Sequence, residues 1–298
     1  MTAEHAGPVR APLSESALTR ALIRPGGFWS EMRVVQRTGS TNADLLAQAA
    51  DGAPEGSVLV AEAQTAGRGR LGRTWVSPPR AALTFSVLLR PGAVPPARCG
   101  WIPLLAGLAV AAAVRDVTGL DARLKWPNDV LIGGRKLAGI LAERSAAAVV
   151  VGAGINVTTS RAELPVETAT SLAIEGAAGG TGANWAGGVV AGGMGSATDG
   201  SAQDDRHRLL CAVLGELERR YLAWTGTPSP GDPEASGLAP EYRRRCHTLG
   251  RPVRAELPGR EAIWGTATDI DSEGRLLLRT ADGQLAVSAA DIIHLRPS

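Results

Sequence analysis

The sequence is poor in the features that mark secreted, metal-binding or strongly nucleic-acid-binding proteins. Its three cysteines, Cys99, Cys211 and Cys246, are widely spaced and form no C-x-x-C pair, which disfavours a disulfide framework or a zinc site and suits a reducing compartment. The 31 Lys and Arg residues nearly balance the 29 Asp and Glu residues, for a formal net charge of +2. Nonspecific nucleic-acid binding usually requires a strongly basic face, so any positive charge that matters here must be local.

The chain also lacks an obvious targeting or membrane-spanning segment. Its first residues, MTAEHAGPVRAPLSES, contain no basic region followed by an apolar one, as a secretory signal would. The most apolar run, from Trp101 to Val114, is interrupted by Pro103 and ends before Arg115, which makes it shorter than the ~20 residues that span a bilayer. We therefore expect a cytoplasmic protein without a membrane partner.

The apolar content, 44% of 298 residues, is enough for one large core and a smaller appendage. The fold class that we expect is α+β, with a mixed β-sheet core and packed helices over residues 33–246. Short strands separated by PGR, DSEG and ADG turns predict a small SH3-like β-barrel over 247–298. Residues 1–32 should be an N-terminal extension, disordered over about 1–16 because that stretch is rich in Ala, Pro, Glu and Ser. A Gly/Ala/Ser-rich stretch at about 176–203 predicts a flexible insertion.

Periodicity and capping residues predict the elements of the core. The stretch TGSTNADLLAQAADG predicts a helix that begins at Ser40 or Thr41 and stops at Gly52. Residues 34–37 and the apolar runs SVLVAEA and LTFSVLLR predict strands, and WIPLLAGLAVAAAVRDVTG predicts a buried helix. From Ala122 onward, the runs RLKW, DVLI, KLAGILAE and AAVVVGAGINV predict a β-meander.

Between the first two apolar runs lies the loop QTAGRGRLGRTW, which is rich in both glycine and arginine. Its glycines Gly67, Gly69 and Gly72 match the G-x-G-x-x-G dinucleotide fingerprint, but Pro78 and Pro79 oppose the helix that must follow the last glycine. Glycines permit close backbone approach, and arginines are bidentate donors suited to phosphate. The loop is therefore either a solvated surface loop or an anion-binding cradle that can open and close.

Four further patches lie at expected strand ends or turns: TGSTN at 38–42, KWPND at 125–129, KLAG at 136–139 and GAGIN at 152–156. Each has a purely structural interpretation, as a helix cap, a tight turn, a solvated lysine or a weakened strand. Each also suits a binding site: helix N-termini and lysines attract anions, and strand glycines often mark where a ligand approaches. One patch alone is a weak signal.

All five patches in this order and spacing form a specific pattern. The set TGSTN, QTAGRGRLGRTW, KWPNDV, RKLAGILAE and VGAGINV resembles the biotin–protein ligase family over roughly residues 33–172, and residues 249–298 resemble its small C-terminal barrel. The resemblance implies a class II synthetase-like, biotin–lipoate ligase fold. It also implies an enzyme that uses ATP and Mg²⁺ to form biotinyl-5′-AMP and pyrophosphate from biotin. Biotin would then pass to a lysine of a biotin carboxyl carrier protein or domain, with release of AMP.

The same resemblance implies roles for individual residues. Lys136 would lie between the biotin carboxylate and the α-phosphate and stabilise the charge that develops there. Arg70 would act with it, and Asp129 would position either a metal ion or the incoming lysine. Contacts with biotin are implied for Ser40, Thr41, Asn42, Gln64, Gly67, Arg68, Gly69, Arg70, Lys136, Gly152 and Gly154. Contacts with ATP or the adenylate are implied for Arg68, Arg70, Arg73, Trp75, Asn128, Lys136 and Asn156.

This family chemistry explains the composition of the loop. An acyl-adenylate hydrolyses if water reaches it, yet a protein lysine must be able to enter the site. A glycine-hinged arginine loop that orders only on the bound adenylate would satisfy both demands. Trp75 would anchor the end of the loop by packing, and Gly152 and Gly154 would let the rings of biotin lie against backbone.

Two alternatives remain open at this point. A lipoate–protein ligase shares the core fold and the acyl-adenylate chemistry, although the GRGR-x-GR-x-W loop together with KWPND favours biotin. A DNA-binding regulator is disfavoured by the low net charge. Some family members carry an N-terminal helix-turn-helix domain and act as repressors, but here 37 residues without a two-helix pattern precede Thr38. We therefore expect a single-function enzyme without a DNA partner.

Overall fold

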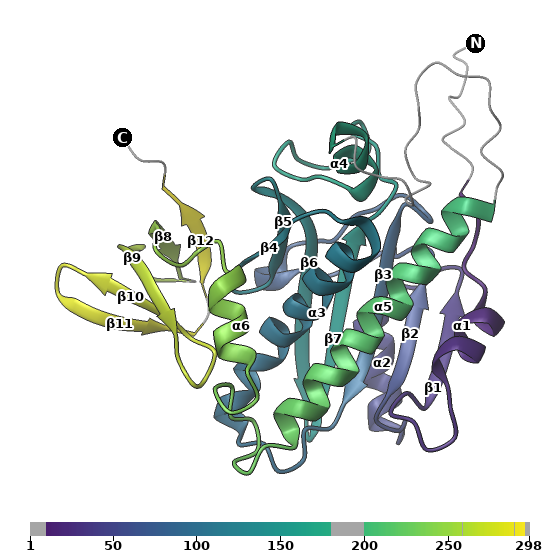
Figure 1. The fold of residues 1–298 in the computed structure, drawn as a ribbon, viewed down its shortest axis with the longest axis horizontal. Helices are drawn as coiled ribbons and strands as arrows, with labels where there is room; N and C mark the ends of the chain where they lie inside the picture. Colours follow the sequence, from purple (N-terminus) through teal and green to yellow (C-terminus); the bar gives the residue numbers. More distant parts are fainter. Residues whose placement is uncertain (1–9, 180–199, 258, 289, 296–298) are drawn as a thin grey trace.

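The computed structural model describes residues 10–179, 200–257, 259–288 and 290–295, and its strands form two sheets (Figure 1). The larger sheet has the order β1-β2-β3-β7-β6-β5-β4; β1 and β2 are parallel and every other neighbouring pair is antiparallel. Its strands are β1 (Glu31–Val35), β2 (Ser57–Ala61), β3 (Ala82–Leu89), β4 (Ala122–Lys125), β5 (Asp129–Ile132), β6 (Arg135–Ser145) and β7 (Ala148–Asn156).

Helices cover both faces of the larger sheet, and because all but one of its strand pairs are antiparallel, the fold class is α+β as expected. On one face Leu59, Leu88 and Val150 pack with Leu45 and Ala49 of α2. The alternate residues of the same strands point the other way and join the main core with α3 and α5. Central strands buried on both faces read as continuous apolar runs, as β2 and β7 do. The helices are α1 (Glu15–Leu22), α2 (Thr41–Ala50), α3 (Trp101–Thr118), α4 (Leu172–Gly179), α5 (Gly200–Thr225) and α6 (Leu238–Arg245).

Most of the predicted core elements are confirmed. Ser40 is the N-cap of α2 and accepts a hydrogen bond from the Ala43 N–H, and α3 ends at Gly119, whose φ is 74°. The predicted meander corresponds to β4 through β7. The first strand lies earlier than predicted, at Glu31–Val35 instead of 34–37, because its parallel pairing follows the span of β2.

The second sheet contains five antiparallel strands in the order β11-β10-β9-β8-β12. They are β8 (Pro252–Glu256), β9 (Ile263–Ile270), β10 (Leu276–Thr280), β11 (Gly283–Val287) and β12 (Asp291–His294). Two buried tryptophans of the larger domain hold the turn between β9 and β10. The indole N–H of Trp101 donates to the Asp271 carbonyl, and that of Trp126 to the Gly274 carbonyl, each at 3.0 Å. These bonds fix the second sheet beside the turn that carries KWPND.

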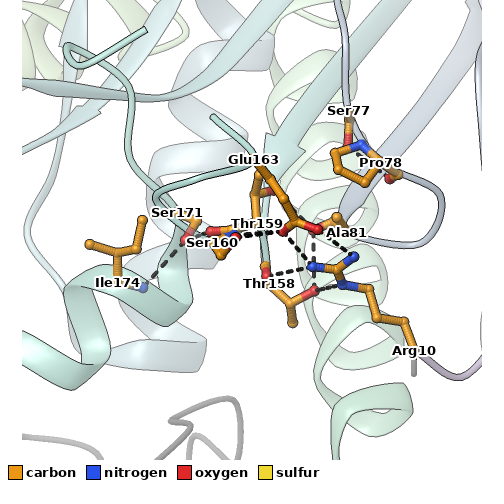
Figure 2. A network of polar contacts seen from close by, with 10 residues as sticks. All are labelled: Arg10, Ser77, Pro78, Ala81, Thr158, Thr159, Ser160, Glu163, Ser171 and Ile174. Carbon is orange, nitrogen blue, oxygen red and sulfur yellow. Dashed lines mark hydrogen bonds and ion pairs between the residues drawn. The ribbon is translucent and has the colours of Figure 1, made fainter. Parts of the chain in front are cut away.

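The N-terminal segment differs from the expectation of disorder to about residue 16. Arg10 donates from Nε to Thr158 Oγ1 at 2.9 Å and pairs with Glu163 at 2.7 Å, as Figure 2 shows. Leu13 is buried, and Ser14 caps α1. The composition missed this order because the partners of Arg10 lie about 150 residues away in sequence. Residues 1–9 lie outside the described residues.

Two other expectations are refined. The ends of the predicted insertion at 176–203 are helical, in α4 and at the start of α5, and the expectation for 180–199 lies outside the described residues. The run at Trp101, expected to be too short to span a bilayer, lies in a helical stretch over Pro96–Thr118; its 23 residues contain an 18-residue window with a mean hydropathy of 1.7, which is enough by length and composition to cross a membrane. Within the fold 67% of that window is buried, because α3 packs against α5 and the sheet.

Candidate active site

A cavity of about 260 Å³ opens where the glycine- and arginine-rich loop meets the N-terminus of α2, the strands β3, β6 and β7, and β12 of the second sheet. Most of the residues singled out in the sequence line it, although they come from five separate segments. They are Ser40, Thr41, Asn42, Gln64, Arg68, Gly69, Arg70, Arg73, Trp75, Asn128, Asp129, Lys136, Gly152 and Gly154.

Asn156 and Gly67 do not line this cavity. Asn156 is 5% exposed and its amide donates to the Thr170 carbonyl at 2.9 Å, so the expectation that it contacts adenosine is not supported by its position. Gly67 instead lets the loop close on itself: its carbonyl accepts from Trp75 N–H at 2.9 Å, and a Cβ there would lie 2.5 Å from the Trp75 carbonyl oxygen.

The structure adds lining residues that the sequence reasoning did not assign to a ligand. Lys125 and Trp126 belong to KWPND, so the motif itself could have indicated them. The lining residues of the second sheet have no motif around them in the sequence that indicates a binding role, because they reach the cavity only through the packing of one sheet against the other. The added residues are Thr74, Thr84, Phe85, Lys125, Trp126, Pro127, Gly139, Ile140, Leu141, Ala153, Glu256, Asp291, Ile292 and Ile293.

One end of the cavity is a network of neutral hydrogen-bonding groups. The Gln64 carbonyl oxygen accepts from the Thr41 N–H at 2.8 Å and from its hydroxyl at 3.1 Å. Ser86, fully buried on β3, lies 2.7 Å from the Thr41 hydroxyl and 2.6 Å from the Asn42 side-chain oxygen. Gly152 leaves room for Asn42, because a Cβ there would lie 2.1 Å from that oxygen. Such fixed donors and acceptors suit a polar, uncharged ring.

Glu143 of β6 connects this network to the loop. One carboxylate oxygen accepts from the Asn42 amide at 2.8 Å, and the other pairs with Arg68 at 3.1 Å. Glu143 therefore fixes both the orientation of the Asn42 amide and the position of the first loop arginine.

The opposite end of the cavity is cationic. Lys136 Nζ lies 2.6 Å from Asp129 Oδ1, and Arg70 lies 3.4 Å from the Asn128 side-chain oxygen. Burial lowers the pKa of Arg70, an effect that Asp129 opposes and Arg73 reinforces. Burial also lowers the pKa of Lys125, where Lys136 and Arg73 add repulsion against the attraction of Asp129. Crowded cations of this kind favour an anionic ligand.

The loop folds as a short hairpin over the cavity. The Gly69 N–H donates to the Arg73 carbonyl at 2.7 Å, and Arg68 forms a bridge with Thr74. Arg73 reaches the second sheet and pairs with Asp291 of β12. The loop is thus connected by its arginines to β6, to the KWPND turn and to the second sheet.

Trp75 closes the hairpin by packing its ring against Gly139 of β6 and Gly154 of β7. A Cβ on Gly154 would lie 2.3 Å from the Trp75 ring, and one on Gly139 would lie 3.4 Å from it. This agrees with the predicted packing role of Trp75, and it shows that the space at Gly154 is filled by the indole in this structure.

We expect Gly154→Ala to lower kcat/KM about tenfold or more in the biotin-dependent pyrophosphate release that the sequence resemblance implies, because its methyl group must displace the Trp75 ring and overpacking typically costs about 1–3 kcal/mol. The measurement is a double-mutant cycle with Trp75→Ala on that reaction. In the Trp75→Ala background the same glycine substitution should add little. Independent, additive losses would show that Gly154 acts on the ligand directly.

Comparisons with known proteins agree with this geometry. Residues 34–159 match the model of the biotin/lipoate A/B protein ligase family, and residues 248–295 match the biotin protein ligase C-terminal domain. The chain is 42% identical over 292 residues to the biotin–[acetyl-CoA-carboxylase] ligase of Mycobacterium tuberculosis, which covers 97% of this chain and 98% of that protein.

Two further comparisons extend this similarity. The bifunctional ligase/repressor BirA of Bacillus spizizenii is 33% identical over 267 residues, covering 87% of this chain and 71% of BirA. Among solved structures, the biotin protein ligase of Aquifex aeolicus in complex with biotin and ATP aligns with a TM-score of 0.68 and 28% identity, over 89% of this chain and 98% of that one.

Proposed function

The chain belongs to the biotin protein ligase family and is an ATP-dependent biotin–protein ligase, and we propose how its cavity performs the two steps and what accepts the biotin. The acceptor that we propose is a lysine of a biotin carboxyl carrier domain of an acyl-CoA carboxylase. The name of the mycobacterial relative, biotin–[acetyl-CoA-carboxylase] ligase, supports this choice. The observation that carries the proposal is the cavity itself, which has a neutral hydrogen-bonding end and a cationic end.

Biotin would lie with its ureido ring at the neutral end and its carboxylate toward Lys136. The ring's N–H and C=O groups require fixed acceptors and donors, which Ser40, Thr41 and Gln64 offer. Asn42, held by Ser86 and Glu143, would complete this set. The valerate chain would then run past Gly152 toward the cations.

In the first step a carboxylate oxygen of biotin attacks the α-phosphorus of ATP, and the bond to the leaving pyrophosphate breaks. Two anions must meet, so their repulsion has to be offset by cations that are already in place. Lys136 and Arg70 are positioned for this at the cationic end. In the second step the neutral amine of the acceptor lysine attacks the acyl carbon, AMP leaves and the amine loses a proton.

A magnesium ion would enter with the nucleotide. Within the described residues no group of three or more His, Cys, Asp or Glu side chains could hold a metal ion by itself. Mg²⁺ in nucleotide sites is commonly held by one or two carboxylates plus substrate phosphates, and Asp129 on the cavity wall fits that pattern. The ion would neutralise phosphate charge. Asp129 would also hold Lys136 in place through their ion pair.

The direct test combines the protein with labelled biotin, ATP, Mg²⁺ and a biotin carboxyl carrier domain. We expect label on the carrier and biotin-dependent release of pyrophosphate. A parallel reaction with labelled lipoate should give neither product. Label from lipoate but not from biotin would overturn the assignment in favour of lipoate ligation.

The loop should be protected from trypsin by the reaction's substrates. Without ligand, trypsin should cut first at Arg68, Arg70 or Arg73. Biotin with ATP and Mg²⁺ should suppress these cuts because the adenylate engages the same arginines, whereas ATP alone should protect less. Mass spectrometry of early fragments measures this, with cleavage at Arg243–Arg245 as the control because ligands also raise global stability. Equal protection at both places would leave no specific role for the loop.

A further inference from the structure

An exposed strip of the second sheet begins at the rim of the active-site cavity. Ile293 of β12, Arg254 of β8 and Trp264 of β9 are consecutive cross-strand partners, so their side chains share one face of the sheet. We call these three residues the rim strip. Ile293 also lines the cavity, as do Glu256 and Asp291, which pair with each other in the adjacent row of the same face.

The rim strip combines two large exposed apolar side chains with Arg254, which pairs with Glu256. Trp264 is 56% exposed and Ile293 40% exposed, and Trp264 is the one aromatic among the large apolar side chains that are exposed in the described residues. The Arg254 guanidinium lies 5.7 Å from the centre of the Trp264 ring, which fixes the indole in place by a cation–π contact.

The side chains of Trp264 and Ile293 are not part of the buried core of the second sheet. The buried face of the same sheet is built by other residues, among them Val253, Ala255, Ala267 and Leu278. Removing the outward Trp264 should therefore leave the core intact. Trp and Arg are among the residue types most enriched in the energetic hot spots of protein interfaces.

We propose that the rim strip is the docking surface for the protein acceptor of biotin. This inference rests on the proposed function, in which a lysine on a folded domain must reach into the cavity. That domain has to lie against the edge of the cavity. The rim strip reaches this edge at Ile293, which lines the cavity. Beside it, Asp291 also lines the cavity and pairs with Arg73 of the loop. An acceptor seated here would contact the loop and the second sheet together.

The test separates the two half-reactions in Trp264→Ala. Trp264 does not line the cavity, so biotin-dependent pyrophosphate release should stay at the wild-type rate; Arg254 is left unchanged because it pairs with the lining residue Glu256. Single-turnover transfer from preformed adenylate to a biotin carboxyl carrier domain should show kcat/KM for the carrier reduced about tenfold or more in Trp264→Ala. Leu222→Ala is the matched control, because Leu222 is an exposed leucine on α5, 48% accessible, and should transfer normally.

Three outcomes would overturn the proposal, and they are distinguishable. If wild-type protein makes no adenylate, the proposed function itself fails. If adenylate forms and Trp264→Ala transfers biotin like wild type, only the docking surface fails. If Trp264→Ala instead dissociates a dimer in sedimentation experiments while transfer is unchanged, the rim strip joins two copies of this chain.

Discussion

Lys136→Ala should lower the rate of biotinyl-adenylate formation about 10²–10³-fold, the typical cost of removing one group that stabilises transition-state charge. Lys136 lies at the cationic end of the cavity, 2.6 Å from Asp129 and 35% exposed, where substrates can reach it. Stopped-flow measurement of biotin-dependent pyrophosphate release checks the rate, and circular dichroism checks the fold.

A neighbouring cation provides the matched control for this prediction. Arg135 precedes Lys136 on β6 but pairs with Glu175 at 2.8 Å, outside the cavity. Arg135→Ala should change the rate by no more than a few-fold. Pyrophosphate release at the wild-type rate in Lys136→Ala would exclude the proposed role.

A double variant distinguishes two effects of Lys136→Ala: the loss of a cation that attracts the phosphates, and the repulsion of the phosphates by the unpaired Asp129 carboxylate. Lys136→Ala leaves Asp129 without its ion-pair partner, and the freed carboxylate could repel the phosphates. In Lys136→Ala with Asp129→Asn that repulsion is gone. We expect the double variant to be at least as slow as the single one, because the cation is still missing and Asp129→Asn also removes the carboxylate proposed for Mg²⁺; only recovery would assign the defect of Lys136→Ala to the freed charge of Asp129.

The local parts of this site could be predicted from the sequence because their signals are local. A helix cap at Ser40, the glycines of the loop and the strand runs after Ala122 each depend on residues within one or two turns of chain. The resemblance that the five patches carry then implied the site residues, and 14 of those residues line one cavity. Backbone chemistry and periodicity account for the cap, the loop glycines and the strands, but not for that site.

The remaining parts depend on contacts between distant segments. Alternation along β7 puts Asn156 on the same face as Gly152 and Gly154. Asn156 does not line the cavity, and its amide donates instead to Thr170 in the segment at 168–170, which pairs with Lys136 through both backbone groups of Lys136. No residue near Asn156 in the sequence predicts that the segment at 168–170 folds back to this position.

Glu143 and the second-sheet residues illustrate the same limit. Glu143 reads as an ordinary polar position near the end of a strand, and only its contacts with Asn42 and Arg68 give it a role. Asp291 becomes part of the site because Trp101 and Trp126 hold the second sheet against the first. Pairings over such separations are set by tertiary packing.

Arg206→Met should lower the free energy of unfolding by about 3–5 kcal/mol, the usual cost of leaving one member of a buried ion pair without its partner. The Arg206 and Glu62 side chains are 3% and 2% exposed, and Arg206 Nη1 lies 2.6 Å from Glu62 Oε2. Arg206 also donates to the Ala11 carbonyl at 2.6 Å, and Glu62 accepts from the Leu13 N–H. The pair thus joins α5, the end of β2 and the N-terminal segment.

Equilibrium urea unfolding of matched variants measures this cost. Arg219→Met is the control on the same helix, because its pair with Glu216 involves a 61% exposed arginine and should be worth about 0–1 kcal/mol. Adding Glu62→Gln to Arg206→Met should recover part of the lost stability, because the uncompensated charge is then removed. Equal effects of Arg206→Met and Arg219→Met would show that the buried ion pair does not stabilise the fold.

The Arg206→Met variant should also show a raised KM for biotin, because Glu62 lies two residues before Gln64, where the loop over the cavity begins. The Arg219→Met control should leave that KM unchanged.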